Sequence, residues 1–263
     1  MSSEPLAPFD RGKPNIARAY DFFLGGKDNF AADRELAAKI LAVYPLTEVL
    51  VRENRAFLAR AVDFVSRQGI TQFIDIGSGL PTTPNTHEVA GKVNPDARVT
   101  YVDNDPVVLS HARALLAAAG RVDAVAGDLR DPDAVLASVR QAGMIDLDQP
   151  VCVILGMILH FFDQAEADNV TAELVRTIVP GSFMIMSTGV NNDTPELADR
   201  FGSTYNAATV HSFDRKIVAG HFAGLELVEP GLTEVRNWRP EFSLDETEIR
   251  PGDILGGVGR KLA

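Results

Sequence analysis

Short apolar runs recur along the chain after Gly69, and segments with helical periodicity separate them. A parallel strand that is covered by helices on both faces reads as a continuous apolar run, because neither face meets water. Runs of this kind occupy residues 73–76, 99–103, 122–126, 151–155, 183–187 and 225–228. Their alternation with helical segments predicts an α/β fold with a parallel, doubly wound sheet.

The first 68 residues have a different, mostly helical pattern. Residues 31–43 and 48–68 repeat apolar positions at helical spacing, which predicts an N-terminal helical extension. Before them, residues 18–29 mix aromatic, charged and glycine residues. Two interpretations are open for this segment: a helix that packs its aromatic residues and ends at Gly25, or a lid over the strand ends, since lids need apolar anchors and flexible glycines.

Composition narrows the class of protein. A chain of 263 residues, of which 46% are hydrophobic, can form one large α/β domain with additions or at most two small domains. The formal charge of −11 argues against nucleic acid as a partner, because phosphate neutralisation needs clustered Lys and Arg. Cys152 is the single cysteine, which excludes an internal disulfide and a cysteine-rich metal site. We therefore expect a small or a basic partner, and of these we predict a small molecule.

Targeting, membrane and metal signals are missing from the sequence. The first residues carry neither a basic start nor an apolar segment, so we expect no secretory signal and a cytoplasmic protein. The longest apolar stretch, residues 151–162, is well short of the ~20 residues of a membrane helix. Acidic residues are abundant but spread, and histidines lack metal-ligand spacing, so we expect no metal site and no membrane contact.

Candidate chemistry begins with the sequence Phe-Ile-Asp-Ile-Gly-Ser-Gly at residues 73–79. An apolar run that ends in an acid and two glycines is typical of a buried strand that turns close to a ligand, and ligands collect where parallel strands end. The next predicted strand again ends in an acid, Asp103. A carboxylate at that place can accept both hydroxyls of a ribose. The two strand ends together predict half of a nucleotide-type site.

These residues resemble the class I S-adenosylmethionine-dependent methyltransferases, and within them a bacterial group known only as S-adenosyl methyltransferase. The resemblance covers nearly the whole chain. It rests on five motifs: Tyr-Asp-Phe-Phe-Leu-Gly-Gly-Lys-Asp-Asn at 20–29, Asp-Ile-Gly-Ser-Gly-Leu-Pro at 75–81, Asn-Thr-His-Glu at 85–88, Tyr-Val-Asp-Asn-Asp-Pro at 101–106 and Gly-Asp-Leu at 127–129.

The resemblance implies a Rossmann-like, doubly wound, seven-stranded sheet that is mostly parallel. Its last strand would be antiparallel, and we place that strand in the terminal segment, residues 254–262. The chain then divides into an N-terminal helical region and lid, residues 1–68, and a Rossmann-like methyltransferase domain, residues 69–263.

The resemblance also implies a set of residues that bind S-adenosyl-L-methionine. The first loop would approach the methionine and ribose parts through Asp75, Gly77, Ser78 and Gly79. Asp103 would bind the ribose, and Asn104 would lie beside the adenine. Asp128 and Leu129 would hold the adenine amino group and edge, while Leu155 and Gly156 would lie where cofactor and acceptor meet. A separate hypothesis concerns Tyr20, with Arg18, Lys27 and Asn29: because an aromatic face suits a sulfonium and a cation suits a carboxylate, these residues would close over the cofactor or the acceptor.

The first loop departs from two family patterns. Pro81 stands where the generic methyltransferase loop has a third glycine, and Pro84 stiffens the segment further, so we expect the following helix to begin late. A dinucleotide loop of the Gly-x-Gly-x-x-Gly kind would need glycine at Thr82. The same stretch therefore disfavours a nicotinamide-dependent oxidoreductase.

Methyl transfer asks little of side chains, because the sulfonium supplies an activated methyl group and the enzyme mainly aligns a nucleophile with it. A general base is needed only if the acceptor must lose a proton. His160 is the candidate base, and its alternative is a hydrogen-bonded packing residue. Trp238 is open to two interpretations as well, a wall of the acceptor pocket or a core aromatic.

The function that the sequence predicts is S-adenosylmethionine-dependent methyl transfer to an unidentified small-molecule oxygen or nitrogen acceptor. Two alternatives stay open: a module that binds S-adenosylmethionine without turnover, and, less favoured, the nicotinamide-dependent oxidoreductase. The oligomeric state is open.

Overall fold

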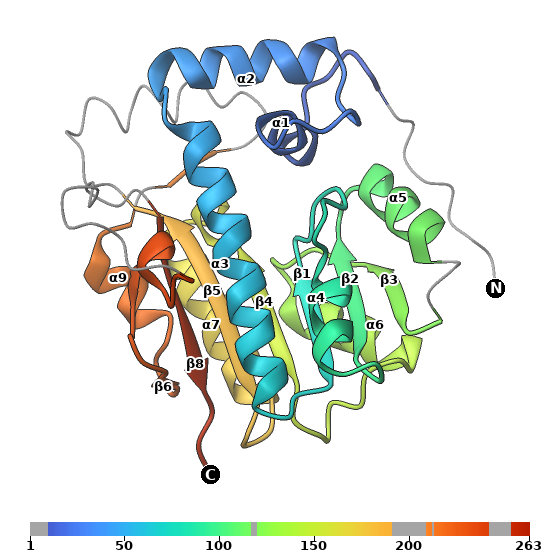
Figure 1. The fold of residues 1–263 in the computed structure, drawn as a ribbon, viewed down its shortest axis with the longest axis vertical. Helices are drawn as coiled ribbons and strands as arrows, with labels where there is room; N and C mark the ends of the chain where they lie inside the picture. The colour runs from blue at the N-terminus through green and yellow to red at the C-terminus, as the bar shows by residue number, and fades with distance from the viewer. Residues whose placement is uncertain (1–9, 117–119, 191–208, 212, 242–253) are drawn as a thin grey trace.

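The strands form one sheet at the centre of the fold. The structure is a computed structural model that describes residues 10–116, 120–190, 209–211, 213–241 and 254–263. The sheet has eight strands in the order β3-β2-β1-β4-β5-β8-β6, with β7 paired to β8 (Figure 1). The strands are β1 Gln72–Ile76, β2 Arg98–Asp103, β3 Val122–Ala126, β4 Cys152–Gly156, β5 Phe183–Gly189, β6 Glu226–Leu227, β7 Thr233–Glu234 and β8 Ile254–Arg260.

The five strands β1 to β5 are parallel, as the apolar runs predict. Strand β8 is antiparallel to β5 and β6 and lies between them, which confirms the placement of the last strand. The predicted count of seven strands is wrong, because β7 also pairs with β8. Residues 225–228 contribute only the two-residue strand β6, and it pairs with β8 alone.

Helices cover both faces of the sheet (Figure 1). One apolar core joins it to α3 and α4, and a second joins it to α6, α7 and α9. The helices are α1 Ile16–Phe23, α2 Ala31–Val43, α3 Thr47–Arg67, α4 Thr86–Val93, α5 Pro106–Leu116, α6 Pro132–Ala142, α7 Gln164–Thr177 and α9 Arg215–Gly220, with short 3-10 turns η1 Leu159–Phe161 and η2 Val235–Asn237. Among the residues described, no helix has the length and apolar character to span a membrane.

The sequence predicts a helix that runs from Pro106 to Ala119 and a second helix that Ser212 caps and that runs to His221. The helix predicted from Ser212 begins instead at Arg215, because Asp214 caps it by accepting the backbone N–H of Ile217 at 2.8 Å. Ser212 itself, and residues 117–119 of the helix that starts at Pro106, lie outside the described residues.

The glycines of β8 allow close packing on the sheet. A Cβ at Gly256 would lie 2.9 Å from both Phe57 of α3 and Val235 of η2. Glycine inside a strand often marks such a close approach, so the residues that weaken the strand pattern in sequence are the ones that let large side chains cross it. Helix α3 thereby belongs to the same core as the sheet.

Helices α1 and α2 lie over the end of the sheet where the parallel strands finish (Figure 1). They share a small apolar core that includes Phe23, Leu36 and Ile40. Helix α1 ends before Gly25 and buries Phe23 in this core, so residues 18–29 contain the packed helix that one of the two interpretations predicts. A buried ion pair fixes α1 to α2, because Arg18 Nε lies 2.8 Å from Asp33 Oδ2.

Candidate functional site

A cavity of about 370 Å³ opens at the carboxyl ends of β1, β2, β3 and β4. This volume falls within the range of small-molecule sites, which runs from about 300 to 1,000 Å³. Residues from the strand ends, from α1 and from α3 line it. Ten of the residues predicted for the cofactor are among them: Tyr20, Asp75, Gly77, Ser78, Gly79, Asp103, Asn104, Asp128, Leu129 and Gly156.

The first loop approaches the cavity with its backbone. Gly77 has φ +68°, and its N–H donates to Val102 O at 2.8 Å. A Cβ at this position would lie 2.0 Å from Cδ1 of Ile158, which also lines the cavity. Glycine is therefore required both by the left-handed backbone and by the neighbouring side chain. The loop then runs through Pro81 and Pro84, and α4 begins only at Thr86, as predicted.

Asp103 is the central acid of the site. Its side chain accepts the Gly79 N–H at Oδ2 (3.0 Å) and the Asp105 N–H at Oδ1 (2.9 Å). Burial raises the pKa of this carboxyl to about 6, although the two backbone donors act in the opposite direction. Because a carboxylate oxygen can accept more than one hydrogen bond, Asp103 retains acceptor capacity for a ligand in the cavity.

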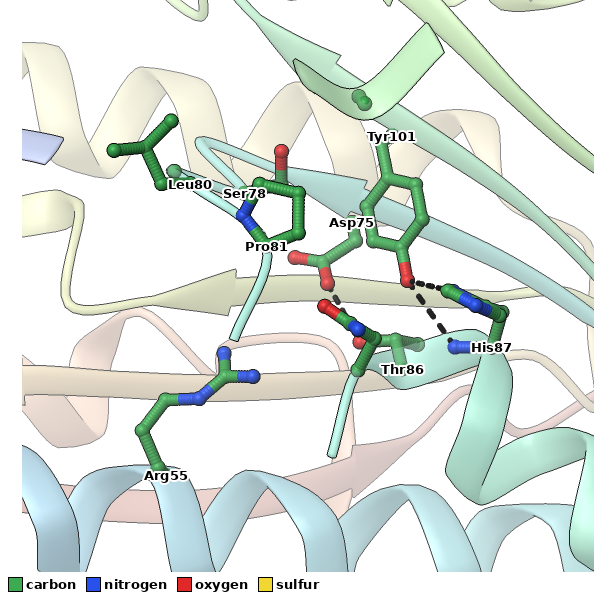
Figure 2. A pocket seen from close by; sticks show the side chains of 11 residues that line it. Arg55, Asp75, Ser78, Leu80, Pro81, Thr86, His87 and Tyr101 are labelled. Atoms are coloured by element: carbon green, nitrogen blue, oxygen red, sulfur yellow. Dashed lines mark hydrogen bonds between the residues drawn. The ribbon is translucent and has the colours of Figure 1, made fainter. Parts of the chain in front are cut away.

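Asp75 lies beside a second, much smaller space of about 20 Å³ (Figure 2). The Thr86 hydroxyl donates to Asp75 Oδ2 at 2.6 Å, and burial raises the pKa of this carboxyl as well. Tyr101 closes the same space, with its hydroxyl accepting the His87 N–H at 3.1 Å and lying 2.8 Å from His87 Nδ1. The buried acid therefore lies in a fixed polar environment.

Arg55 of α3 is a cavity residue that sequence reasoning missed. Its guanidinium donates through Nη2 to the carbonyls of Thr82 (2.9 Å) and Pro84 (3.0 Å), so it holds the proline-containing loop. Figure 2 shows it directed towards the region of Pro81 and Asp75. It lines both the large cavity and the small space. Helical periodicity alone carries no signal that this arginine faces the strand ends.

The end of β3 supplies the opposite side of the cavity. Asp128 accepts the backbone N–H of Arg130 at 3.0 Å, and Leu129 is buried beneath it. The Arg130 guanidinium lies over the ring of Phe162, 5.3 Å from its centroid. Asn104 lines the cavity between this wall and the end of β2.

The N-terminal segment closes the cavity from above the strand ends. Residues 14–17 and Tyr20 line it, and Asn15 hydrogen-bonds to the carboxylate of Asp105. The other residues proposed for closure lie elsewhere: Arg18 pairs with Asp33, Asn29 donates to Asp21 Oδ2 at 2.9 Å, and Lys27 is exposed away from the lining.

Two predicted site residues do not line the cavity. Leu155 is fully buried behind Gly156. His160 is 7% exposed, its ring stacks on Phe161, and burial lowers its pKa to about 4. Its Nδ1 has no hydrogen-bond partner among the described residues. His160 is therefore buried next to the cavity lining without being part of it, a placement that fits a packing residue.

Trp238 is a core residue. It is 0% exposed and packs edge-to-face on Phe57 and Phe64 of α3, with ring centroids 5.5 and 5.8 Å apart. It does not line the cavity, so of its two interpretations the core aromatic is the one that the structure supports. Within the described ranges, no group of three or more His, Cys, Asp or Glu residues is arranged to hold a metal ion.

Comparison with known proteins identifies relatives. A candidate methyltransferase from Thermobifida fusca YX, whose crystal structure is known, is 40% identical over 96% of each chain, with a TM-score of 0.90. A DUF574 family protein from Streptomyces avermitilis MA-4680 is 36% identical, with a TM-score of 0.86, over 95% of this chain and 98% of that one. No curated protein gives a significant match.

A more distant structure shares the fold. The N-methyltransferase NodS from Bradyrhizobium japonicum WM9, crystallised with S-adenosyl-L-homocysteine, is 14% identical with a TM-score of 0.51, over 93% of this chain and 98% of that one. The family model described as S-adenosyl methyltransferase matches residues 2–262. The chain therefore belongs to the S-adenosyl methyltransferase family.

Proposed function

We propose that this protein binds S-adenosyl-L-methionine in the cavity and transfers its methyl group to a small-molecule oxygen or nitrogen acceptor. The observation that carries the proposal is the buried carboxylate of Asp103, which lines a cavity of suitable volume at the ends of parallel strands. A buried acid with spare acceptor capacity fits a ribose, whose two hydroxyls donate hydrogen bonds.

The remaining lining residues fit the other parts of the cofactor. Asp75 and Arg55 lie on the same side of the cavity, so we assign the methionine ammonium group to Asp75 and the methionine carboxylate to Arg55. We assign the adenine to the wall formed by Asn104, Asp128 and Leu129. The first-loop residues Gly77, Ser78 and Gly79 approach with their backbone, and Tyr20 and Gly156 lie towards the acceptor.

In this proposal the chain's own residues align the cofactor with the acceptor, enclose both and exclude water. The bound sulfonium supplies the activated methyl group. Among the described residues that line the cavity there is no histidine or cysteine, and in this proposal the carboxylates of Asp75, Asp103 and Asp128 bind the cofactor, so we assign no general base. We therefore propose that positioning carries most of the rate, that His160 packs rather than catalyses, and that Leu155 supports the loop from behind.

The N-terminal helical region, residues 1–68, supplies the lid in this proposal, and residues 69–263 form the methyltransferase domain. The support is that residues 14–17 and Tyr20 line the cavity and that Asn15 bonds to Asp105, next to the proposed ribose acid. We propose a cytoplasmic protein, as the sequence predicts.

Substituting Gly77 by alanine tests the loop. A left-handed backbone costs an alanine roughly 1–2 kcal/mol, and the new methyl group would clash with Ile158, which lines the cavity, so this side chain must move. We expect S-adenosylmethionine to bind roughly tenfold more weakly, which corresponds to about 1.4 kcal/mol. Isothermal calorimetry measures the affinity.

Gly143 provides the matched control, because it has φ +77° and no heavy atom lies within 4 Å of a Cβ built on it. Gly143→Ala should lose only the stability that the left-handed backbone costs, while it keeps wild-type affinity. Equal affinities for the two alanine variants would contradict the proposed approach of the first loop to the cofactor.

The pH dependence of binding tests the charge of Asp103. Its pKa is about 6 in the free protein, because burial disfavours the charged form. Below that pH the carboxyl is protonated and loses acceptor strength, so we expect affinity for S-adenosylmethionine to fall roughly tenfold from pH 7 to pH 5. The cofactor's own amino group, with a pKa near 7.8, stays protonated over this interval.

Asp103→Asn is the control for this titration, since it removes the titrating group and retains the shape. Its affinity should be low and depend less on pH, and any residual slope belongs to Asp75, whose pKa is also raised by burial. A wild-type affinity that is constant between pH 5 and 7 would contradict a role for ionised Asp103.

Direct titration and turnover distinguish the three candidate functions. We expect S-adenosylmethionine and S-adenosylhomocysteine to bind and NADH not to bind in calorimetry. Radiolabelled methyl transfer to a panel of small phenols, alcohols and amines then separates an enzyme from a binding module. Binding of NADH without S-adenosylmethionine would favour the oxidoreductase, and tight binding without any methylated product would favour the module.

A further inference from the structure

A chain of hydrogen bonds runs along one wall of the cavity and joins elements that are far apart in the sequence. At its centre is Asn54 of α3, which is 1% exposed and lines the cavity. The Ser187 hydroxyl of β5 donates to Asn54 Oδ1 at 2.7 Å. On its other side, Asn54 Nδ2 donates to the hydroxyl oxygen of Tyr20 in α1 at 3.1 Å.

Both ends of this chain reach the wall of the cavity. Tyr20 lines the cavity, and its hydroxyl donates to the carbonyl of Val51 at 3.3 Å. At the other end, the backbone N–H of Met157 donates to both oxygens of Ser187, to Oγ at 3.2 Å and to the carbonyl at 2.9 Å. Met157 also lines the cavity, directly after β4, and has φ +54°. A side chain other than glycine is strained there and persists only when its surroundings hold it.

All donors of this chain point in one direction, from Met157 through Ser187 and Asn54 to Tyr20 and then Val51. Because these groups are buried or partly buried, removal of the Tyr20 or the Ser187 hydroxyl takes a hydrogen-bond partner from the side-chain amide of Asn54. Substitution of Tyr20 should therefore have the same effect on the site as substitution of Ser187, although these two residues are linked only through Asn54.

We infer that Asn54 and Ser187 are positioning residues, which hold the Tyr20 side chain and the strained Met157 turn in one arrangement at the acceptor end of the cofactor site. The inference rests on the proposed function, because S-adenosylmethionine is the ligand whose site is being held. Neither residue carries a charge or a reactive group, so both act through the groups that they fix.

A double-mutant cycle tests this coupling. Tyr20→Phe and Ser187→Ala each remove a hydroxyl from one end of the chain, and each should weaken S-adenosylmethionine binding about tenfold in calorimetry. The double variant should be weaker by about the same factor as either single variant. A weakening near a hundredfold would show that the two sites act independently and would overturn the inference, as would wild-type affinity in both single variants.

Matched variants separate positioning from folding. Ser187→Thr retains the hydroxyl and should bind within threefold of wild type, while loss of affinity in it to the level of Ser187→Ala would contradict the role of the hydroxyl. Thr188→Val changes the adjacent buried residue of β5, whose hydroxyl lies 3.5 Å from the Gly189 carbonyl, its one side-chain hydrogen bond within the described residues, and should leave affinity unchanged. In an Asn54→Leu background, Tyr20→Phe and Ser187→Ala should have no further effect, and a further tenfold loss would overturn the inference.

Titration of the wild-type chain with S-adenosylmethionine distinguishes a failure of the proposed function from a failure of this inference. If the wild-type chain fails to bind S-adenosylmethionine, the proposed function falls and this inference with it. If the wild type binds and the cycle is additive, only the inference falls. Should Ser187→Ala fail to fold, Ser187→Cys replaces it in the same cycle with the same expected and contradicting results.

Discussion

Asp103→Ala is expected to weaken S-adenosylmethionine binding by roughly a hundredfold, which corresponds to about 3 kcal/mol. Each hydrogen bond to a charged group contributes about 1.5–3 kcal/mol, and the proposed ribose contact has two of them. The substitution also removes the acceptor for the backbone N–H groups of Gly79 and Asp105, so the first loop and the end of β2 lose a shared anchor. Isothermal calorimetry measures the loss.

Asp96→Ala is the matched control, because it removes an exposed carboxylate that lies just before β2, at the other end of that strand. This variant should bind S-adenosylmethionine as wild type does, since the only ion pair of Asp96 within the described residues is with the exposed Arg121. If Asp103→Ala retained wild-type affinity, the proposed position of the ribose would be wrong.

Trp238→Ala is expected to lower the free energy of unfolding by about 3–5 kcal/mol, the usual cost of truncating a buried tryptophan. The side chain is fully buried between Phe57 and Phe64, and its backbone carbonyl accepts the guanidinium of Arg60 at 2.9 Å. Truncation leaves a cavity beneath α3, whereas the carbonyl contact can persist. Urea denaturation measures the change.

Trp238→Phe gives the graded comparison. The indole Nε1 has no hydrogen-bond partner in the described parts of the chain, so phenylalanine removes that buried donor and a part of the volume only. It should lose less stability than the alanine variant, and both folded variants should bind S-adenosylmethionine normally. Normal stability combined with a changed acceptor preference would instead favour a wall of the acceptor pocket.

The parallel half of the sheet was predictable from sequence because burial on both faces leaves a continuous apolar signature. Strand β2 follows its predicted range closely, and β4 is displaced by one residue. Strands β6 and β7 have two residues each, too few to form a pattern, and their partner β8 is rich in glycine. Strand β8 in turn packs on Phe57 of α3 and Val235 of η2, and no local signal encodes these contacts.

The acids of the site were predictable for a related reason. Asp75 and Asp103 lie at or near the ends of apolar runs, and the ends of neighbouring parallel strands meet at one edge. Arg55 and Asn54 were missed because they come from α3, and the rotation of a helix against a sheet is not written in its periodicity. His160 follows β4 as expected, but the turn η1 directs it into the core.

The most direct test of the central claim is a crystal structure of this protein with S-adenosyl-L-homocysteine. The account predicts electron density for the nucleoside in the cavity, with both ribose hydroxyls within hydrogen-bond distance of the Asp103 carboxylate and the sulfur directed towards Tyr20 and Gly156. Density for the nucleoside at another place, or none at saturating concentration, would contradict it.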